Sequence, residues 1–137
     1  MVDVVVLVAL LAFFFVGVAL QRRRSADRQR RRATVELVID DHHVRRRLGD
    51  GREESARWQH VVSVEVVCTP VRTADGATAF VLIAEGPESG CLVPLGVGHD
   101  DALVQQLVRL ERLRIQEFTA ATEHKPPRRT MVWTRDA

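Results

Sequence analysis

The chain begins with an apolar segment of 17 residues, from Val4 to Leu20, that contains no charged or strongly hydrogen-bonding side chain. At about 1.5 Å per residue, a helix over this segment would be about 25 Å long, close to the shortest length that crosses the hydrocarbon core of a bilayer. Gln21 and the long arginine side chains that follow can extend it toward the lipid headgroups. We therefore predict a transmembrane anchor over residues 1–21.

Two other interpretations of this segment stay open, a cleaved signal peptide and a buried core helix. A signal peptide carries positive charge before its apolar core, whereas Asp3 is the only charged side chain before Val4. The residues Val18-Ala19-Leu20 are also a poor small-x-small cleavage site. A core helix would be expected to show a polar face to water, and this segment has none. The sequence favours the anchor.

A cluster of arginines follows the apolar segment and sets the predicted orientation. Its members are Arg22, Arg23, Arg24, Arg28, Arg30, Arg31 and Arg32. Because positive flanks stay in the cytoplasm, we predict a single-pass protein of the inner (plasma) membrane with its N-terminus outside and its C-terminal domain in the cytoplasm. The same arginines are candidate contacts for anionic lipid headgroups, at about 1 kcal/mol each near the surface. A nucleic-acid partner is not expected, because the membrane segment already explains the cluster.

The remaining chain has the length and composition of one small globular domain. We assign residues 22–33 to a basic juxtamembrane linker and residues 34–137 to a cytoplasmic domain, since about 100 residues hold one core. Residues 33–137 contain 13 basic and 16 acidic side chains, so they carry a net charge of −3. The two cysteines, Cys68 and Cys91, show no metal-ligand spacing. We expect buried reduced thiols, no metal and no cofactor.

Short apolar runs separated by turn residues predict a series of antiparallel strands. The predicted strands cover residues 34–40, 44–48, 53–58, 64–68, 79–85 and 91–94. The first has Val35, Leu37 and Ile39 on one face, which indicates a half-buried strand. The fifth is continuously apolar, which is typical of a strand buried on both faces. Residues 49–51 predict a tight hairpin.

One arginine conflicts with this alternation. Val44 and Leu48 share a face of the second strand, and Arg46 lies between them on that face. A buried arginine without a partner would be costly. We therefore expect Arg46 to lie at an open rim, to meet a carboxylate, or to be moved by a β-bulge.

After residue 96 the apolar period changes from that of a strand to that of a helix. Asp100 is a candidate cap for a helix over residues 101–112. Its apolar stripe is formed by Leu103, Leu107 and Leu110. A second helix is predicted over residues 115–122, and Pro126-Pro127 prevents its extension.

Residues 130–134 alternate and predict a last strand that returns to the sheet. Strands followed by helices indicate an α+β fold, an antiparallel β roll or open barrel. We expect Trp58 and Phe80 to pack together with the leucine stripe of the first helix.

The hairpin that ends in Trp58, with Val61 three residues later and Val64 six residues later, resembles the opening strands of bacterial pleckstrin-homology-like domains. The later Gly90–Pro94 segment and the closing Trp133 are similar to those of small uncharacterised bacterial single-pass membrane proteins with such a domain. The resemblance covers roughly residues 34–134. It implies a half-open antiparallel barrel closed by a C-terminal helix, and it brings no catalytic residues. Here a second helix and a strand are predicted where such domains usually end in one long helix.

Three groups of residues are candidate sites of chemistry. Asp40-Asp41-His42-His43 contains metal-ligand residue types, but consecutive turn residues point in different directions, which favours a solvated turn. Gly96-Val97-Gly98 before a helix could cradle a phosphate, but Asp100 would repel the anion. A catalytic cysteine would need a base such as His60 or His99, which the spacing does not require. None of the common hydrolase, kinase or nucleotide-binding motifs is present.

These observations predict a non-enzymatic, membrane-tethered interaction or scaffolding module. Its partner would be another protein at the inner face of the membrane, and an exposed strand edge is one way to recruit it. The alternative is a domain that binds anionic lipid through the arginine cluster, helped by Arg45 and Arg47. A second alternative is a small enzyme with a site of unrecognised type.

Overall fold

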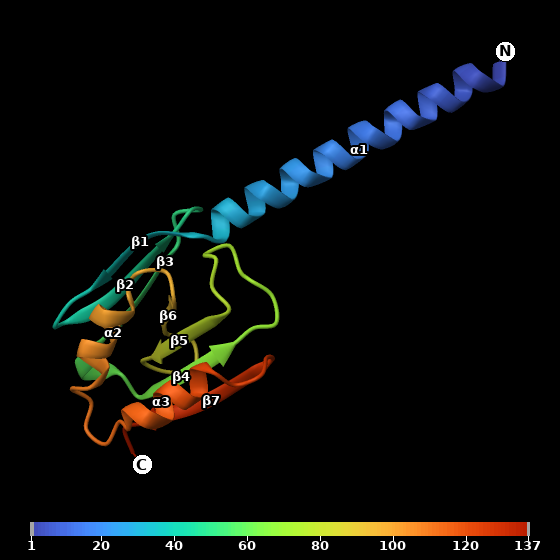
Figure 1. The fold of residues 1–137 in the computed structure, drawn as a ribbon. Helices are drawn as coiled ribbons and strands as arrows, with labels where there is room; N and C mark the ends of the chain where they lie inside the picture. Colours follow the sequence, from blue (N-terminus) through green and yellow to red (C-terminus); the bar gives the residue numbers. More distant parts are fainter. Residues whose placement is uncertain (1, 137) are drawn as a thin grey trace.

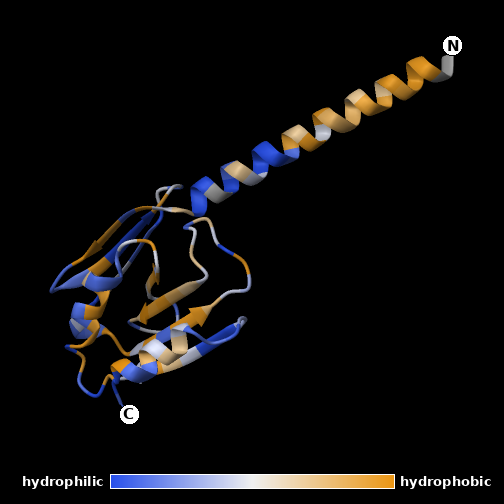
Figure 2. Cartoon of the chain, viewed as in Figure 1, coloured by the Kyte–Doolittle hydropathy of each residue, from blue (hydrophilic) through white to orange (hydrophobic). Residues whose placement is uncertain are grey.

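A long helix that projects from a compact α+β domain dominates the computed structural model of this chain (Figure 1), which describes residues 2–136. The helix, α1, covers Val2–Arg32. Its first part is apolar and its last turns are hydrophilic (Figure 2). No part of its apolar stretch is buried against the domain, which excludes the alternative of a buried core helix. Met1 and Ala137, the outermost residues of the predicted anchor and domain, lie outside the described residues.

The domain contains two antiparallel sheets. The first has the order β1-β2-β3, formed by Thr34–Ile39, His43–Leu48 and Glu53–Arg57. The second has the order β6-β5-β4-β7, formed by Gly90–Pro94, Ala79–Ala84, Ser63–Cys68 and Arg128–Thr134. The sheets meet where β3 approaches β6. The predicted succession of six strands along the chain and the returning last strand are confirmed.

Two helices complete the core. Helix α2 covers Asp100–Leu107 and helix α3 covers Ile115–Thr122. Leu103 and Leu107 of α2 are fully buried, and Phe118 of α3 is almost fully buried. Helix α3 packs against β4 and β7, so the helices cover apolar side chains of the second sheet.

The first helix differs from its prediction at both ends. Its cap residue is His99, and Asp100 is the first helical residue; the Asp100 carboxylate accepts the N–H of Gly96 instead of capping the helix. The helix ends at Leu107, five residues early. The N–H groups of Arg109 and Leu110 donate to carbonyls three residues back, so the chain after Leu107 forms tighter turns of the 3-10 type. Arg112 then adopts a left-handed φ of 68°.

The core joins the two sheets and both short helices. Trp58, Leu103 and Leu107 belong to one buried cluster, with Leu110 packed at its side, as predicted. Phe80 is also buried but lies outside this cluster, because it alternates with Val81 and faces the other side of β5. That strand is buried on both faces, as its continuous apolar run predicts.

A β-bulge changes the pattern at the start of β1. The register of β1 on β2 shifts between Thr34 and Glu36. As a result Val35 is 57% exposed, whereas Leu37 and Ile39 pack against the core. The prediction that Val35 shares their buried face is wrong, since the extra residue turns its side chain outward.

Arg46 is buried and has carboxylate partners, which is one of the three outcomes expected for it. Its guanidinium donates to Asp75 Oδ2 at 2.7 Å and to Glu54 Oε1 at 3.3 Å. Its Nε donates to Thr34 Oγ1 at 2.6 Å. Asp75 also accepts the Thr34 N–H, and Glu54 accepts the Leu92 N–H of β6. This network joins the first residue of β1 to β2, β3, β6 and the loop before β5.

The β2–β3 turn binds the end of α1 through its backbone. The Gly49 N–H donates to the carbonyl of Ala33, and the Asp50 N–H donates to the carbonyl of Arg31, each at 3.0 Å. The last carbonyls of a helix lack partners within the helix, and here a turn of the domain supplies them. A Cβ at Gly49 would collide with the backbone carbonyl of Arg30. Only glycine fits this close approach without a shift.

Candidate interaction surfaces

The predicted lipid-contacting arginines lie on the last three turns of α1. All seven are exposed: Arg22, Arg23, Arg24, Arg28, Arg30, Arg31 and Arg32. At 100° per residue these positions point in all directions around the helix axis. They therefore form a basic collar rather than one charged face, and the predicted linker is helical up to residue 32.

Two further arginines that were predicted to help bind lipid are already paired. Arg45 and Arg47 on β2 both contact the carboxylate of Glu36, at 3.4 and 3.1 Å. Their side chains are 40% and 49% exposed, so these contacts exchange readily with solvent or with another anion. The structure places them on the sheet and not in the collar.

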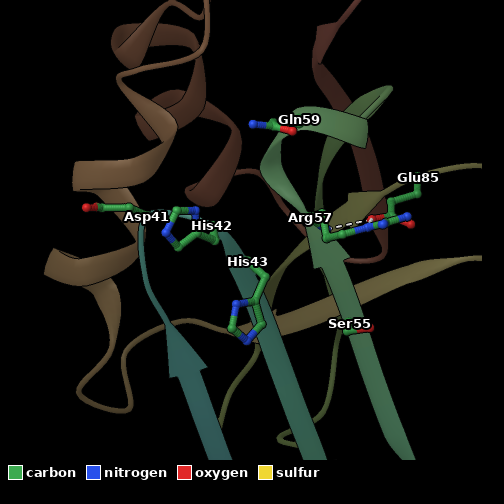
Figure 3. Close-up of a pocket in the computed structure, with 7 residues that line it drawn as sticks. All are labelled: Asp41, His42, His43, Ser55, Arg57, Gln59 and Glu85. Carbon is green, nitrogen blue, oxygen red and sulfur yellow. Dashed lines mark hydrogen bonds and ion pairs between the residues drawn. The ribbon is translucent and has the colours of Figure 1, made fainter.

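A polar pocket lies beside the β1–β2 turn (Figure 3). His42 and His43 line one side, and Arg57 and Gln59 line the other. Arg57 is paired with Glu85. The Glu85 carboxylate accepts a hydrogen bond from the backbone N–H of Arg57 at 2.6 Å and lies 3.6 Å from its Nε. Within residues 2–136, no three His, Cys, Asp or Glu side chains converge as metal ligands.

The two aspartates of this turn act in the fold. Asp40 Oδ1 accepts the N–H groups of His42 and His43, and these hydrogen bonds lower the pKa of Asp40 below its usual value. Asp41 points away from them and accepts hydrogen bonds from Gln106 and Arg109, which lower its pKa. The consecutive residues thus point in different directions. Asp40 stabilises the turn from within, and Asp41 links the turn to Gln106 and Arg109.

The other candidate sites of chemistry are also occupied by contacts within the chain. The Gly96 N–H, a candidate phosphate donor, is bound by Asp100 at 2.8 Å. Cys68 and Cys91 are buried free thiols, as predicted. Burial, with a smaller effect of the Glu54 charge, raises the pKa of Cys91 to about 12. A thiol with this pKa is a poor nucleophile at neutral pH.

Strand β7 provides an open sheet edge. It is hydrogen-bonded to β4 on one side and is the last strand of its sheet. A hollow of about 620 Å³ is lined by residues 131–134 of β7 and by residues 112–114. The described lining includes no residue of β4, which pairs with the inner edge of β7, so the hollow lies along the outer part of β7. This stretch of β7 carries a β-bulge at Val132, where Trp133 pairs with Val64 and Met131 pairs with Glu65.

A second hollow continues the first. It has a volume of about 280 Å³ and shares Arg112, Trp133 and Thr134 with its neighbour. Trp133 Nε1 donates to the carbonyl of Glu111 at 2.6 Å and so ties β7 to the opposite wall. We call the two hollows together the β7 groove. The segments that line it, β7 and the chain between α2 and α3, lie near the C-terminus and away from the attachment of α1 (Figure 1).

The sequence indicated only part of this surface. The alternation of residues 130–134 predicted the strand, and an exposed strand edge was anticipated without saying which strand. The opposite wall was missed, because the helical pattern was extended to residue 112 and its early end was not recognised. The left-handed Arg112 carries no strong local signal, since glycine or asparagine would be expected there.

Searches against models of protein families, curated proteins and solved structures found no match to this chain.

Proposed function

We propose that this chain is a non-enzymatic, membrane-anchored module that binds another protein at the inner face of the membrane. In this proposal α1 crosses the bilayer with its N-terminus outside, and the domain lies in the cytoplasm. The observation that carries it is an apolar helix wholly outside the fold, hydrogen-bonded at its end to a domain whose β7 edge is open. Tethering would concentrate the domain near other membrane proteins.

The exposure of α1 supports the membrane part of the proposal. Phe13, Phe14 and Phe15 are 81%, 66% and 68% exposed. Soluble monomers rarely expose continuous apolar patches of more than a few hundred Å², so a lipid environment is the natural partner of such a helix. The basic collar at its C-terminal end supports the cytoplasmic placement of the domain.

The architecture also leads us to propose a pleckstrin-homology-like domain. Two antiparallel sheets of three and four strands support this, and so does Trp58, whose Nε1 donates to the Asp40 carbonyl within the core. The C-terminal part departs from one long helix, because α3 and β7 follow α2. A solved structure in which the two sheets do not form a half-open antiparallel barrel would contradict this assignment.

Membrane insertion and orientation can be tested with C-terminal reporters fused to the full chain. A reporter that is active only in the cytoplasm should work, and one that is active only after export should not. The chain should remain in the membrane after alkaline carbonate extraction. Export of the C-terminus, or a mature N-terminus near Gln21, would contradict the proposal.

Partner binding can be tested by co-purification from native membranes. The full chain is compared with a variant in which residues 4–20 are replaced by an unrelated apolar segment of equal length. A partner of the domain should be retained by both chains. The proposal fails if no specific protein is retained by either.

A second candidate function, recognition of anionic lipid, is favoured by the basic collar. The full chain would be placed in neutral and in anionic vesicles, and trypsin cleavage at residues 22–32 would be followed. Binding to lipid headgroups should slow cleavage in anionic vesicles only, and added salt should remove the difference. Equal rates in the two vesicles would exclude this function.

A further inference from the structure

The β7 groove has a shape that suits an extended chain. Strand β7 is seven residues long, or about 23 Å at 3.3 Å per residue. The outer edge of residues 131–134 runs along the groove, and edge strands present unpaired N–H and C=O groups. A β-bulge at Val132 interrupts the row of these groups. An extended peptide can add to such an edge as a further strand, with the backbone supplying affinity and the flanking side chains supplying specificity.

The groove is basic although the domain is not. The described residues that line it include one carboxylate, Glu111, and four arginines: Arg109, Arg112, Arg114 and Arg135. Arg109 is paired with Asp41, which lies outside the groove, at 2.9 Å. Residues 33–137 as a whole carry a net charge of −3. The positive charge of the groove is therefore a local feature and does not reflect the general composition of the domain.

Two of the four arginines, Arg135 and Arg114, are held in ways that leave room for a ligand carboxylate. Arg135 donates to the carbonyls of Val61 and Gln59, at 2.8 and 2.9 Å, and these neutral groups do not cancel its charge. Arg114 pairs with Glu117 at 3.2 Å, with its side chain 78% exposed. Exposed ion pairs of this kind contribute little, so a carboxylate from a partner can replace Glu117.

Apolar side chains are interleaved with these charges. Met131 is 53% exposed on β7, and Leu113 and the ring of Trp133 line the same groove. The Arg135 guanidinium lies 5.9 Å from the centre of the Trp133 ring. A segment that alternates acidic and apolar side chains would place its acidic set toward the arginines and its apolar set toward Met131. Trp133 lies on the other face of β7, because the bulge at Val132 pairs Trp133 with Val64 and Met131 with Glu65.

We propose that the β7 groove binds an extended acidic segment of a partner protein, which adds to the outer edge of β7 as a strand. This inference rests on the proposed function and names its binding surface and the chemical class of its ligand. The segments that line the groove lie at the end of the domain away from α1 (Figure 1), so neither α1 nor the bilayer that it would cross covers the groove, and a cytoplasmic segment of a partner can reach it.

The test uses photo-crosslinking by the full chain in intact cells. A photoreactive amino acid replaces Met131 in the groove, and in a separate chain it replaces Val71, which is 72% exposed in the loop between β4 and β5. The crosslinked segments are sequenced by mass spectrometry. We expect position 131 to capture a segment of net negative charge, and position 71 not to capture that segment.

A charge variant and its matched control sharpen the test. Arg114→Glu should reduce capture at position 131. Arg52→Glu replaces another exposed, locally paired arginine, at the β2–β3 turn, and should not reduce it. A synthetic peptide of the captured segment should bind the full chain about 3- to 10-fold more weakly after Arg114→Glu. It should also bind more weakly in high salt and protect amides of β7 from hydrogen exchange.

The outcomes separate this inference from the proposed function. Capture of a protein at position 71 but not at 131 would overturn the groove and leave the interaction module standing. Capture of a neutral or basic segment, or of a second copy of this chain, would also overturn the inference. No captured protein at either position would contradict both proposals.

Discussion

The junction with α1 and the outer edge of β7 use their backbone hydrogen-bonding groups in opposite ways. At the junction, N–H groups of the β2–β3 turn donate to the carbonyls of Arg31, in the last turn of α1, and of Ala33, just after it, and Gly49 allows the two backbones to meet. At β7, the outer edge has no strand neighbour within residues 2–136. One end of the domain is therefore closed around its helix, while the other end keeps a strand edge without a strand neighbour among the described residues.

The buried network behind the junction is expected to give the largest effect. Arg46→Met would leave Asp75, which is 6% exposed, without its charged partner, and we expect a loss of about 3–5 kcal/mol in the free energy of unfolding. Arg47→Met is the matched control. Its pair with Glu36 is about half exposed, so its loss should be about 0–1 kcal/mol. Denaturant unfolding measures each value.

A second substitution separates charge from packing in this network. Asp75→Asn in the Arg46→Met chain removes the unpaired charge and should restore part of the lost stability. Equal losses in the free energy of unfolding for Arg46→Met and Arg47→Met would show that the buried network stabilises the domain no more than an exposed ion pair does.

Gly49→Ala should open the junction itself. The new methyl group meets the backbone carbonyl of Arg30, and overpacking of this kind costs about 1–3 kcal/mol. We expect the last turn of α1 to leave the β2–β3 turn and trypsin to cleave faster at residues 30–32. Gly86→Ala is the control, because a Cβ there meets nothing within 4 Å. Unchanged cleavage would mean that the turn does not hold α1.

Trp133→Phe tests the open edge. It removes the hydrogen bond from Nε1 to the Glu111 carbonyl, at a cost of about 0.5–1.5 kcal/mol. The wall formed by residues 109–114 should then exchange its amides faster, while the amides of β1 and β2 should not change. Hydrogen exchange measured by NMR distinguishes the two regions. A change confined to the junction would contradict the assigned contact.

Lowering the pH should have the smallest effect. The pKa of Asp40 is lowered in the folded chain, so its stabilising contribution is complete above its ordinary value of 3.8 and is lost as the pH falls through the folded value. The amides of His42 and His43 should then exchange faster at low pH. Asp40→Asn keeps an acceptor without a titrating charge, so its amide exchange should vary less with pH in this range.

Local patterns were sufficient to predict most of the elements. The 17-residue apolar segment, the strand alternation and the helical spacing of Leu103 and Leu107 depend on neighbours in sequence, and the structure reproduces each of them. Charge position predicts the orientation of α1 for the same reason, because the signal lies within one segment.

Other features exist only because distant segments meet. Asp75 reaches Arg46 across 29 residues, and Glu54 reaches the Leu92 N–H across 38. Neither pairing has a local signal, since alternation tells which face a residue takes and not what it meets there. The β7 groove likewise requires the 109–114 wall to lie beside a strand that begins 14 residues later. The identity of the elements is thus encoded locally, whereas partners, bulges and open edges arise from packing.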